Sequence, residues 1–126
     1  MAFEWKKFLQ LARDVQSRAD GGELDDALLR TAFSRAYYAA FCHARNYARD
    51  WLNFATREDA DDHGRLRAHL TAKRRKGDSE RLERLRNWRN ESDYVDELSF
   101  DLRSTILRAL GDAEYVFASL TAPKKS

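Results

Sequence analysis

The chain has 126 residues, enough for one domain with a single core and no disulfide staple. Five glycines and one proline among many Ala, Leu, Arg, Asp and Glu residues predict an all-α fold and leave few of the turn residues that strands need. A single cysteine cannot form an internal disulfide, and no apolar stretch approaches the roughly 20 residues that cross a bilayer. With no export signal at the start, we expect a cytoplasmic protein without a membrane anchor.

The net charge of +2 is unevenly distributed along the chain. Residues 63–91 carry 10 basic and 4 acidic side chains, a surplus of 6, whereas residues 54–62 carry 1 and 4. A local excess of positive charge attracts phosphate. A solvated helix face beside an exposed loop explains the same excess without a ligand.

Apolar residues at helical spacing predict a first helix over residues 3–19, which the sequence Asp-Gly-Gly ends at 20–22. Residues 23–53 form the longest predicted helix. Alanines occur along it at every fourth position, a spacing that allows a neighbouring backbone to approach closely. These alanines are Ala32, Ala36, Ala40, Ala44 and Ala48.

The pattern breaks over residues 54–62, which predict a mobile loop whose last aspartate caps a third helix. That helix is expected over 63–75, where the run Lys-Arg-Arg-Lys meets Gly77. A fourth is expected over 79–92.

A fifth helix is predicted over 96–121, and residues 122–126 are predicted to be a frayed tail. Its apolar seam is wide enough to face a second chain as well as its own core. Residues 1–126 are therefore expected to form one up-and-down bundle of about five helices.

A guanidinium pair stands out in the fourth predicted helix. Arg86 shares a helix face with Arg89 and Asn90, and this arrangement can clamp a phosphate. The same arginines can instead form ion pairs with Glu83 and Asp93 at neighbouring turns. Spacing alone leaves both interpretations open.

Two stretches, Ser34 to Phe41 (SRAYYAAF) and Leu85 to Tyr94 (LRNWRNESDY), together resemble the HEPN family. Arg89-Asn90 matches the family motif's arginine and the polar residue that follows it, and the helix order matches over about residues 5–120. The resemblance implies an antiparallel helical bundle that often dimerises, with motif arginines of both subunits lining a shared cleft.

One departure from the family pattern concerns catalysis. HEPN ribonucleases usually place a histidine four to six residues beyond the motif arginine, and here Tyr94, Val95 and Asp96 occupy those positions. With an unperturbed pKa of about 10, a tyrosine is only about one part in 10³ ionised at pH 7, which makes Tyr94 a poor general base. A subgroup of HEPN domains with a similar Arg-Asn-x-x-Asp-Tyr ending is the nearer resemblance.

The resemblance also concerns Arg35 in the first stretch. It suggests that Arg35 faces the same cleft as Arg89 or pairs with Asp93, because a buried arginine needs a partner. In the purely structural interpretation, Asp93 holds the fourth helix against the second, and Tyr37 and Tyr38 are core residues with hydrated hydroxyls.

Three functions follow as hypotheses. The first is a HEPN-like homodimer that binds RNA, a nucleotide or a nucleotidyltransferase partner in a toxin–antitoxin or defence module, as the resemblance implies. Its predicted phosphate-binding residues are Arg35, Arg86, Arg89, Asn90 and Tyr94. The second is a metal-independent endoribonuclease toxin in which Arg89 acts with Tyr94 or His69. The third is a structural dimer adaptor whose arginines are all ion-paired.

No cofactor or metal is expected. The acidic residues before His63 are read as capping groups at a helix start. The sequence contains no Gly-rich phosphate loop, CxxC pair or HExxH motif.

Overall fold

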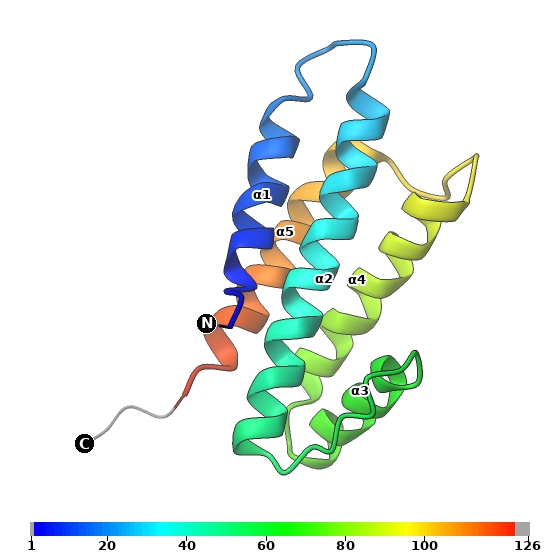
Figure 1. Cartoon of the computed structure of the whole chain (residues 1–126). Coiled ribbons are helices and arrows are strands. Elements are labelled where there is room, and N and C mark those ends of the chain that lie inside the picture. Colours follow the sequence, from blue (N-terminus) through cyan, green and yellow to red (C-terminus); the bar gives the residue numbers. More distant parts are fainter. Residues whose placement is uncertain (1, 123–126) are drawn as a thin grey trace.

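The computed structural model describes residues 2–122, and these form an all-helical bundle without strands (Figure 1). The expectation of an all-α bundle of about five helices is confirmed. The helices are α1 (Lys6–Ser17), α2 (Asp25–Trp51), α3 (Asp62–Ala72), α4 (Lys76–Tyr94) and α5 (Leu102–Ser119). Apart from Ala122, the tail predicted to be frayed lies outside the described residues.

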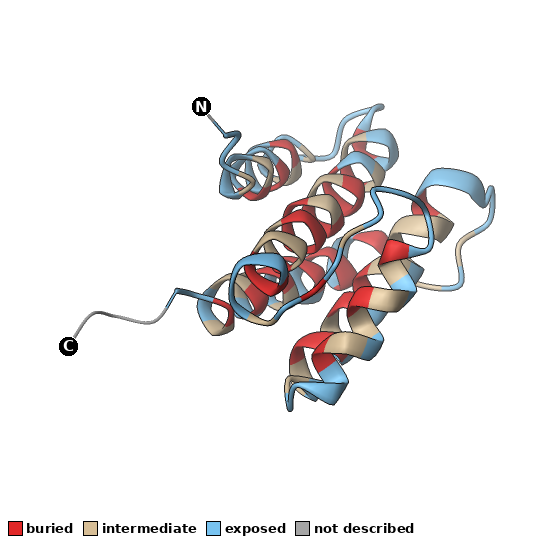
Figure 2. Ribbon diagram, turned by 60° about the horizontal axis from the view of Figure 1, so that its bottom comes forward, coloured by how far each residue is buried: buried red, intermediate tan, exposed pale blue. Residues whose placement is uncertain are grey.

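The long helix α2 is the centre of the bundle and packs against α1, α4 and α5 (Figure 1). All five alanines of its predicted lane are completely buried, which confirms that neighbouring helices approach closely there. Large side chains fill the space on either side, among them Phe33 and Tyr37 of α2, Leu85 of α4 and Ile106 of α5. Figure 2 shows the buried residues along the inner sides of the helices.

Two helix starts differ from the sequence prediction. The turn before α4 is made by Arg74, whose backbone is left-handed with φ of 64°, so Gly77 lies inside the first turn of α4. The last helix begins at Leu102 instead of 96, because the Asp101 carboxylate accepts hydrogen bonds from the amide (2.9 Å) and hydroxyl (2.8 Å) of Ser104.

The connection from α4 to α5 is anchored on α2 by one guanidinium. Arg30 donates hydrogen bonds to the carbonyls of Ser92 (3.0 Å), Val95 (2.7 Å) and Asp96 (3.0 Å). Residues 95–101 therefore form a loop, where the sequence had suggested the first turn of a helix.

The aspartate expected to cap α3 has a different role. Asp62 is the first residue of α3, and its carboxylate accepts from the backbone amides of Arg57 (3.0 Å) and Glu58 (2.9 Å) in the preceding loop. It also accepts from the Thr56 hydroxyl and pairs with Arg65 at 2.7 Å. Burial alone would raise the pKa of Asp62, but these hydrogen bonds outweigh it and hold the pKa below its ordinary value. The buried carboxylate thus fixes the loop against the start of α3.

On the outer side of α5, Leu107 and Tyr115 are exposed. A second chain against this helix stays a prediction. None of the helices in residues 2–122 is long and apolar enough to span a membrane.

Candidate functional site: an arginine face on α2

The two stretches singled out in the sequence lie side by side, because Arg89 of α4 reaches the tyrosines of α2. Its Cζ lies 4.9 Å from the ring centroid of Tyr38 and 5.6 Å from that of Tyr37. Nη2 donates to the Tyr38 hydroxyl, and Nη1 donates to the Asn90 side-chain oxygen at 2.8 Å. Cation–π contacts and neutral acceptors therefore make up most of its surroundings.

The ion pair between Arg89 and Asp93 is long. Nε of Arg89 lies 3.7 Å from a carboxylate oxygen of Asp93, and this buried Nε has no hydrogen-bond partner in the described part of the chain. The Arg89 side chain is only 12% exposed. A buried cation is ordinarily better neutralised, so Arg89 is an incompletely paired charge within this cluster.

The predicted pair between Arg35 and Asp93 is wrong. The Arg35 guanidinium lies 4.9 Å from the ring centroid of Phe8 and 5.7 Å from that of Tyr38, and it donates a 3.4 Å hydrogen bond to the Ser34 hydroxyl. Arg35 extends toward α1, while Asp93 follows Arg89 by one turn of α4 and is its partner. Asp93 therefore does not hold α4 against α2 through Arg35.

Arg86 is half-buried on the same side of α4, and the ion pair with Glu83, one of the two interpretations left open by the sequence, does not form among residues 2–122. Tyr94 is 77% exposed at the last position of α4. Five residues of helix turn it about 140° away from Arg89, so it is not part of this cluster. His69 is also elsewhere, with Nε2 bonded to the carbonyl of Leu52 at 2.6 Å at the end of α2.

A histidine that the sequence reasoning had placed at the start of the third helix, without a functional role, lies among these residues. His63, near the start of α3, stacks on Phe41 with ring centroids 4.0 Å apart and an interplanar angle of 13°. Its Nδ1 forms a hydrogen bond with the Tyr37 hydroxyl. Burial, followed by the positive charges of Arg86 and Arg89, lowers the pKa of His63 to about 4. His63 is therefore neutral at pH 7.

Two further arginines extend the cluster. The Arg45 guanidinium lies 5.9 Å from the centroid of Trp5 and 6.0 Å from that of Phe41. Arg67 donates to the carbonyl of His63 at 3.2 Å. We call Arg35, Arg45, Arg67, Arg86 and Arg89 the arginine face. Contacts through Tyr38, Phe41 and His63 connect four of its members, and the charge of Arg86 acts on His63 and Tyr37.

The arginine face carries uncompensated positive charge. Within residues 2–122, no carboxylate lies within 4 Å of the guanidinium of Arg35, Arg45, Arg67 or Arg86. Burial raises the pKa of Tyr37 in spite of Arg86 and Arg67, so its hydroxyl stays protonated. With Tyr37 and His63 both neutral, a positive potential over this surface favours an anionic ligand.

Comparisons of the chain with protein-family models, with curated proteins and with solved structures found no match. The HEPN assignment therefore stays a prediction that depends on residues 34–41 and 85–94. The geometry of the arginine face is independent of that assignment.

Proposed function

We propose that this HEPN-like bundle binds single-stranded RNA through the arginine face. The observation that supports it is a set of four guanidiniums without a carboxylate partner in the described chain, two of which, those of Arg35 and Arg45, lie over aromatic rings. Arginines bind phosphates and release condensed counterions, and aromatic side chains stack with unpaired bases. Trp5, Phe8 and Tyr38, which these arginines contact, are half-buried and not sealed in the core.

The test is a titration of the protein with a short labelled single-stranded RNA at increasing salt concentration. For three to five phosphate contacts, the logarithm of the association constant should fall with the logarithm of salt by a slope of about −2 to −3.5. The control is Arg84→Gln, which removes an arginine that is already paired with Asp112. Binding that is absent or insensitive to salt would contradict the proposal and favour the adaptor hypothesis.

RNA cleavage is a second candidate, favoured by the position of His63 beside the arginines. With Nδ1–H donating to the Tyr37 hydroxyl oxygen, the Nε2 lone pair of the neutral imidazole can accept the proton of a 2′-hydroxyl. The 2′-oxygen then attacks the adjacent phosphorus, and the 5′-oxygen leaves and takes a proton from water. Arg86 and Arg89 would stabilise the pentavalent phosphate. Burial is the main cause of the low pKa of His63, and a phosphate between these arginines would offset the second cause, their charges, and so make the imidazole a stronger base.

Incubation with RNA in EDTA separates binding from cleavage. If His63 is the base, fragments ending in a 2′,3′-cyclic phosphate form with the parent protein, disappear with His63→Gln, and persist with Tyr94→Phe and His69→Gln. Intact RNA with the parent protein would exclude this second candidate and leave the binding proposal standing.

The resemblance adds two partners to the proposal: a second copy of the chain, and a nucleotidyltransferase of a toxin–antitoxin or defence module. Light scattering measures the first directly, since a homodimer has twice the 14.7 kDa of one chain. Co-expression with a nucleotidyltransferase encoded beside the chain, followed by co-purification, tests the second.

A further inference from the structure

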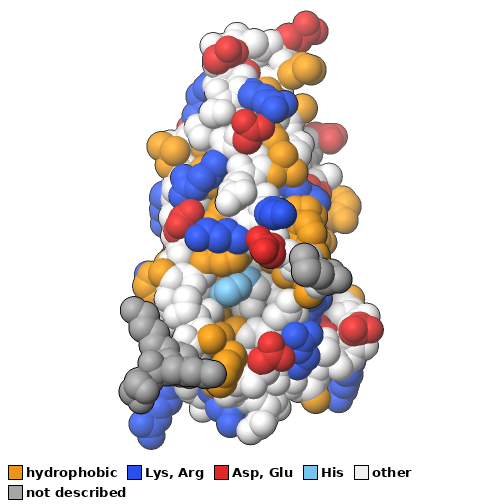
Figure 3. Space-filling view, turned by 60° about the vertical axis from the view of Figure 1, so that its left-hand side comes forward, with side chains coloured by type: hydrophobic (Ala, Val, Ile, Leu, Met, Phe, Trp, Pro, Cys, Tyr) orange, Lys and Arg blue, Asp and Glu red, His pale blue; other side chains and the backbone are white. Residues whose placement is uncertain are grey.

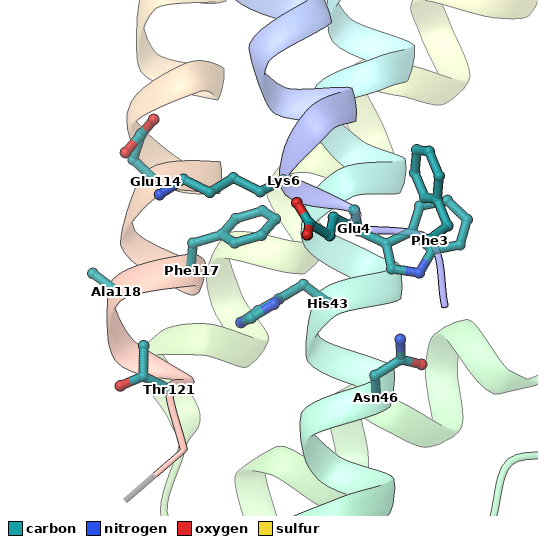
Figure 4. Close-up of a pocket in the computed structure, with 10 residues that line it drawn as sticks. Phe3, Glu4, Lys6, His43, Asn46, Glu114, Phe117, Ala118 and Thr121 are labelled. Atoms are coloured by element: carbon teal, nitrogen blue, oxygen red, sulfur yellow. The ribbon is translucent and has the colours of Figure 1, made fainter. Parts of the chain in front are cut away.

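Helix α5 packs one side against α2 and leaves the opposite side open along its length. The completely buried residues of the helix are Ile106, Ala109, Ala113 and Val116. In Figure 4, Phe117 points from α5 toward His43, while Ala118 lies on the other side of the helix. The exposed residues between 104 and 118 are Ser104, Leu107, Arg108, Gly111, Tyr115 and Ala118. We call these six residues, together with the half-buried Glu114 beside them, the α5 strip.

No contact within the described chain requires a glycine at position 111. Gly111 lies in the interior of α5, where glycine is less favourable than alanine, and its backbone is not left-handed. A Cβ at this position would meet no atom within 4 Å. Gly77 of α4 differs, because a Cβ there would lie 3.3 Å from atoms of Arg81 and Tyr115. A glycine that faces open space in the middle of a helix allows another backbone to approach closely.

A second copy of α5 that packs antiparallel on the first, with a two-fold axis at Gly111, brings matching residues together. Under this symmetry, residues equally far before and after Gly111 face each other across the axis. Leu107 and Tyr115 are each four residues from it, so the leucine of either copy meets the tyrosine of the other. Ser104 and Ala118 are each seven residues away, and their small side chains keep the two helices close.

The charged residues of the α5 strip match under the same symmetry. Arg108 and Glu114 are each three residues from Gly111, so they too face each other. The Arg108 guanidinium lies 5.5 Å from the ring centroid of Trp88, and no carboxylate of residues 2–122 lies within 4 Å of it. Arg13 donates both of its hydrogen bonds to Oε1 of Glu114, which leaves Oε2 without a partner in the described chain. An unpaired guanidinium of each copy therefore meets an unpaired carboxylate oxygen of the other.

The flanks of the α5 strip do not repel a second copy. On the side of α1, Glu114 is paired with Arg13 at 2.9 Å, and on the side of α4, Asp112 is paired with Arg84 at 2.9 Å. Figure 3 shows acidic and basic side chains next to one another on the side of the molecule that carries α1. Because the charges beside the strip are of both signs, two copies can approach without opposing fields of one sign.

We propose that two copies of the chain associate through the α5 strip, with the two helices antiparallel and Gly111 of each copy at the two-fold axis. The proposal names the surface for the second copy that is part of the proposed function. It rests on that homodimer and not on RNA binding. It differs from the shared arginine cleft that the resemblance implies, because the strip faces away from α2 and no member of the arginine face belongs to α5. Each copy keeps its arginine face outside the contact.

Gly111→Leu tests the close approach of the two helices. No atom of its own chain obstructs the new side chain, and leucine favours a helix more than glycine does, so the variant should fold like the parent by circular dichroism. Its mass by light scattering should fall from twice 14.7 kDa to that of one chain. A folded Gly111→Leu that stays a dimer would overturn the proposal. A parent that is a monomer at its highest soluble concentration would do the same.

Charge reversal tests the register. Arg108→Glu sets two carboxylates against each other, and Glu114→Arg sets two guanidiniums against each other. Each should raise the dissociation constant of the dimer about tenfold or more, and the double variant should return it to within about threefold of the parent. Analytical ultracentrifugation measures these constants. A folded double variant that associates no more tightly than the single variants would refute the register.

The matched control is Arg86→Glu, a charge reversal on the arginine face, which should dimerise like the parent. A dimer that Arg86→Glu dissociates and the α5 variants leave intact would place the second copy on the arginine face and overturn the proposal.

Titration of Gly111→Leu with a short single-stranded RNA separates this proposal from the proposed function. Because the arginine face lies outside the contact, the monomeric variant should bind the RNA with the affinity of the parent. Loss of RNA binding together with the dimer would show that the two surfaces are not separate and would overturn the proposal. A parent that dimerises through the α5 strip but binds no RNA would refute the arginine face as an RNA site and leave the strip standing.

Discussion

The arginines on the two sides of helix α4 have different partners. Arg81 and Arg84 meet Asp112 of α5, at 3.8 Å and 2.9 Å, and Arg84 donates through both Nε and Nη2. Arg86 and Arg89 lie toward α2 and the start of α3, among aromatic rings and neutral acceptors. Arginine on this helix is thus neutralised where it joins two helices. Where it borders the arginine face, Arg89 has only a long pair of 3.7 Å with Asp93, and Arg86 has no carboxylate partner in the described residues.

The largest expected contrast between the two sides concerns RNA affinity. Arg86→Gln removes a cation that has no ion-pair partner in the described residues, so the melting temperature should change little. Affinity for a single-stranded RNA should fall about 10- to 100-fold, because a hydrogen bond to a charged group contributes about 1.5–3 kcal/mol. Fluorescence anisotropy at fixed salt measures this fall. Equal affinity in the variant would place the RNA elsewhere.

The contrast between the two sides of α4 also depends on the loop before α3, because this loop helps to hold His63 beside the arginine face. Asp62→Ala leaves the amides of Arg57 and Glu58 without their acceptor, and should lower the free energy of unfolding by about 1–3 kcal/mol. Urea denaturation measures the loss, with Asp61→Ala as a control in the same stretch. An unaltered stability would show that the carboxylate does not hold the loop.

A smaller effect is expected on the pH dependence of folding stability, through His63 on the side of α4 that borders the arginine face. The folded chain keeps His63 neutral down to about pH 4, whereas in the unfolded chain it takes up a proton at its ordinary pKa of 6.5. The contribution of neutral His63 to the free energy of unfolding is complete above pH 6.5, and it is lost as the pH falls toward 4. The parent should therefore lose more stability than His63→Phe over this interval, as measured by paired melting curves. Parallel curves would mean that burial and the arginines do not lower the pKa of His63 in the folded chain.

The smallest effect is expected on the neutralised side. Arg84→Gln removes one partner of a partly exposed ion pair, which contributes about 0–1 kcal/mol. RNA affinity should stay at the parent value while thermal stability falls slightly. A loss of RNA affinity like that of Arg86→Gln would erase the distinction between the two sides of α4.

The helices could be predicted from the sequence because their signals are local. The alanine lane of α2 predicted its own burial, and apolar spacing located both ends of α1 to α4 to within about three residues. The start of α5 was missed because the Asp101 cap competes with the apolar pattern that extends ahead of it.

The site was predictable only in part, because it depends on how helices are rotated against one another. Arg89 and Tyr38 were found as members of two distinctive stretches, and they do meet. The pairing of Arg35 with Asp93 failed because Arg35 reaches α1. His63 was missed because its contacts lie on helices distant in sequence, and no local pattern marks them.

The central claim is that RNA phosphates neutralise the charge that the arginine face leaves unpaired. The most direct test compares the salt dependence of RNA binding in the parent, Arg86→Gln and Arg84→Gln. Loss of one phosphate contact should make the slope shallower by about 0.7 in Arg86→Gln and leave it unchanged in Arg84→Gln. Three identical slopes would contradict the account.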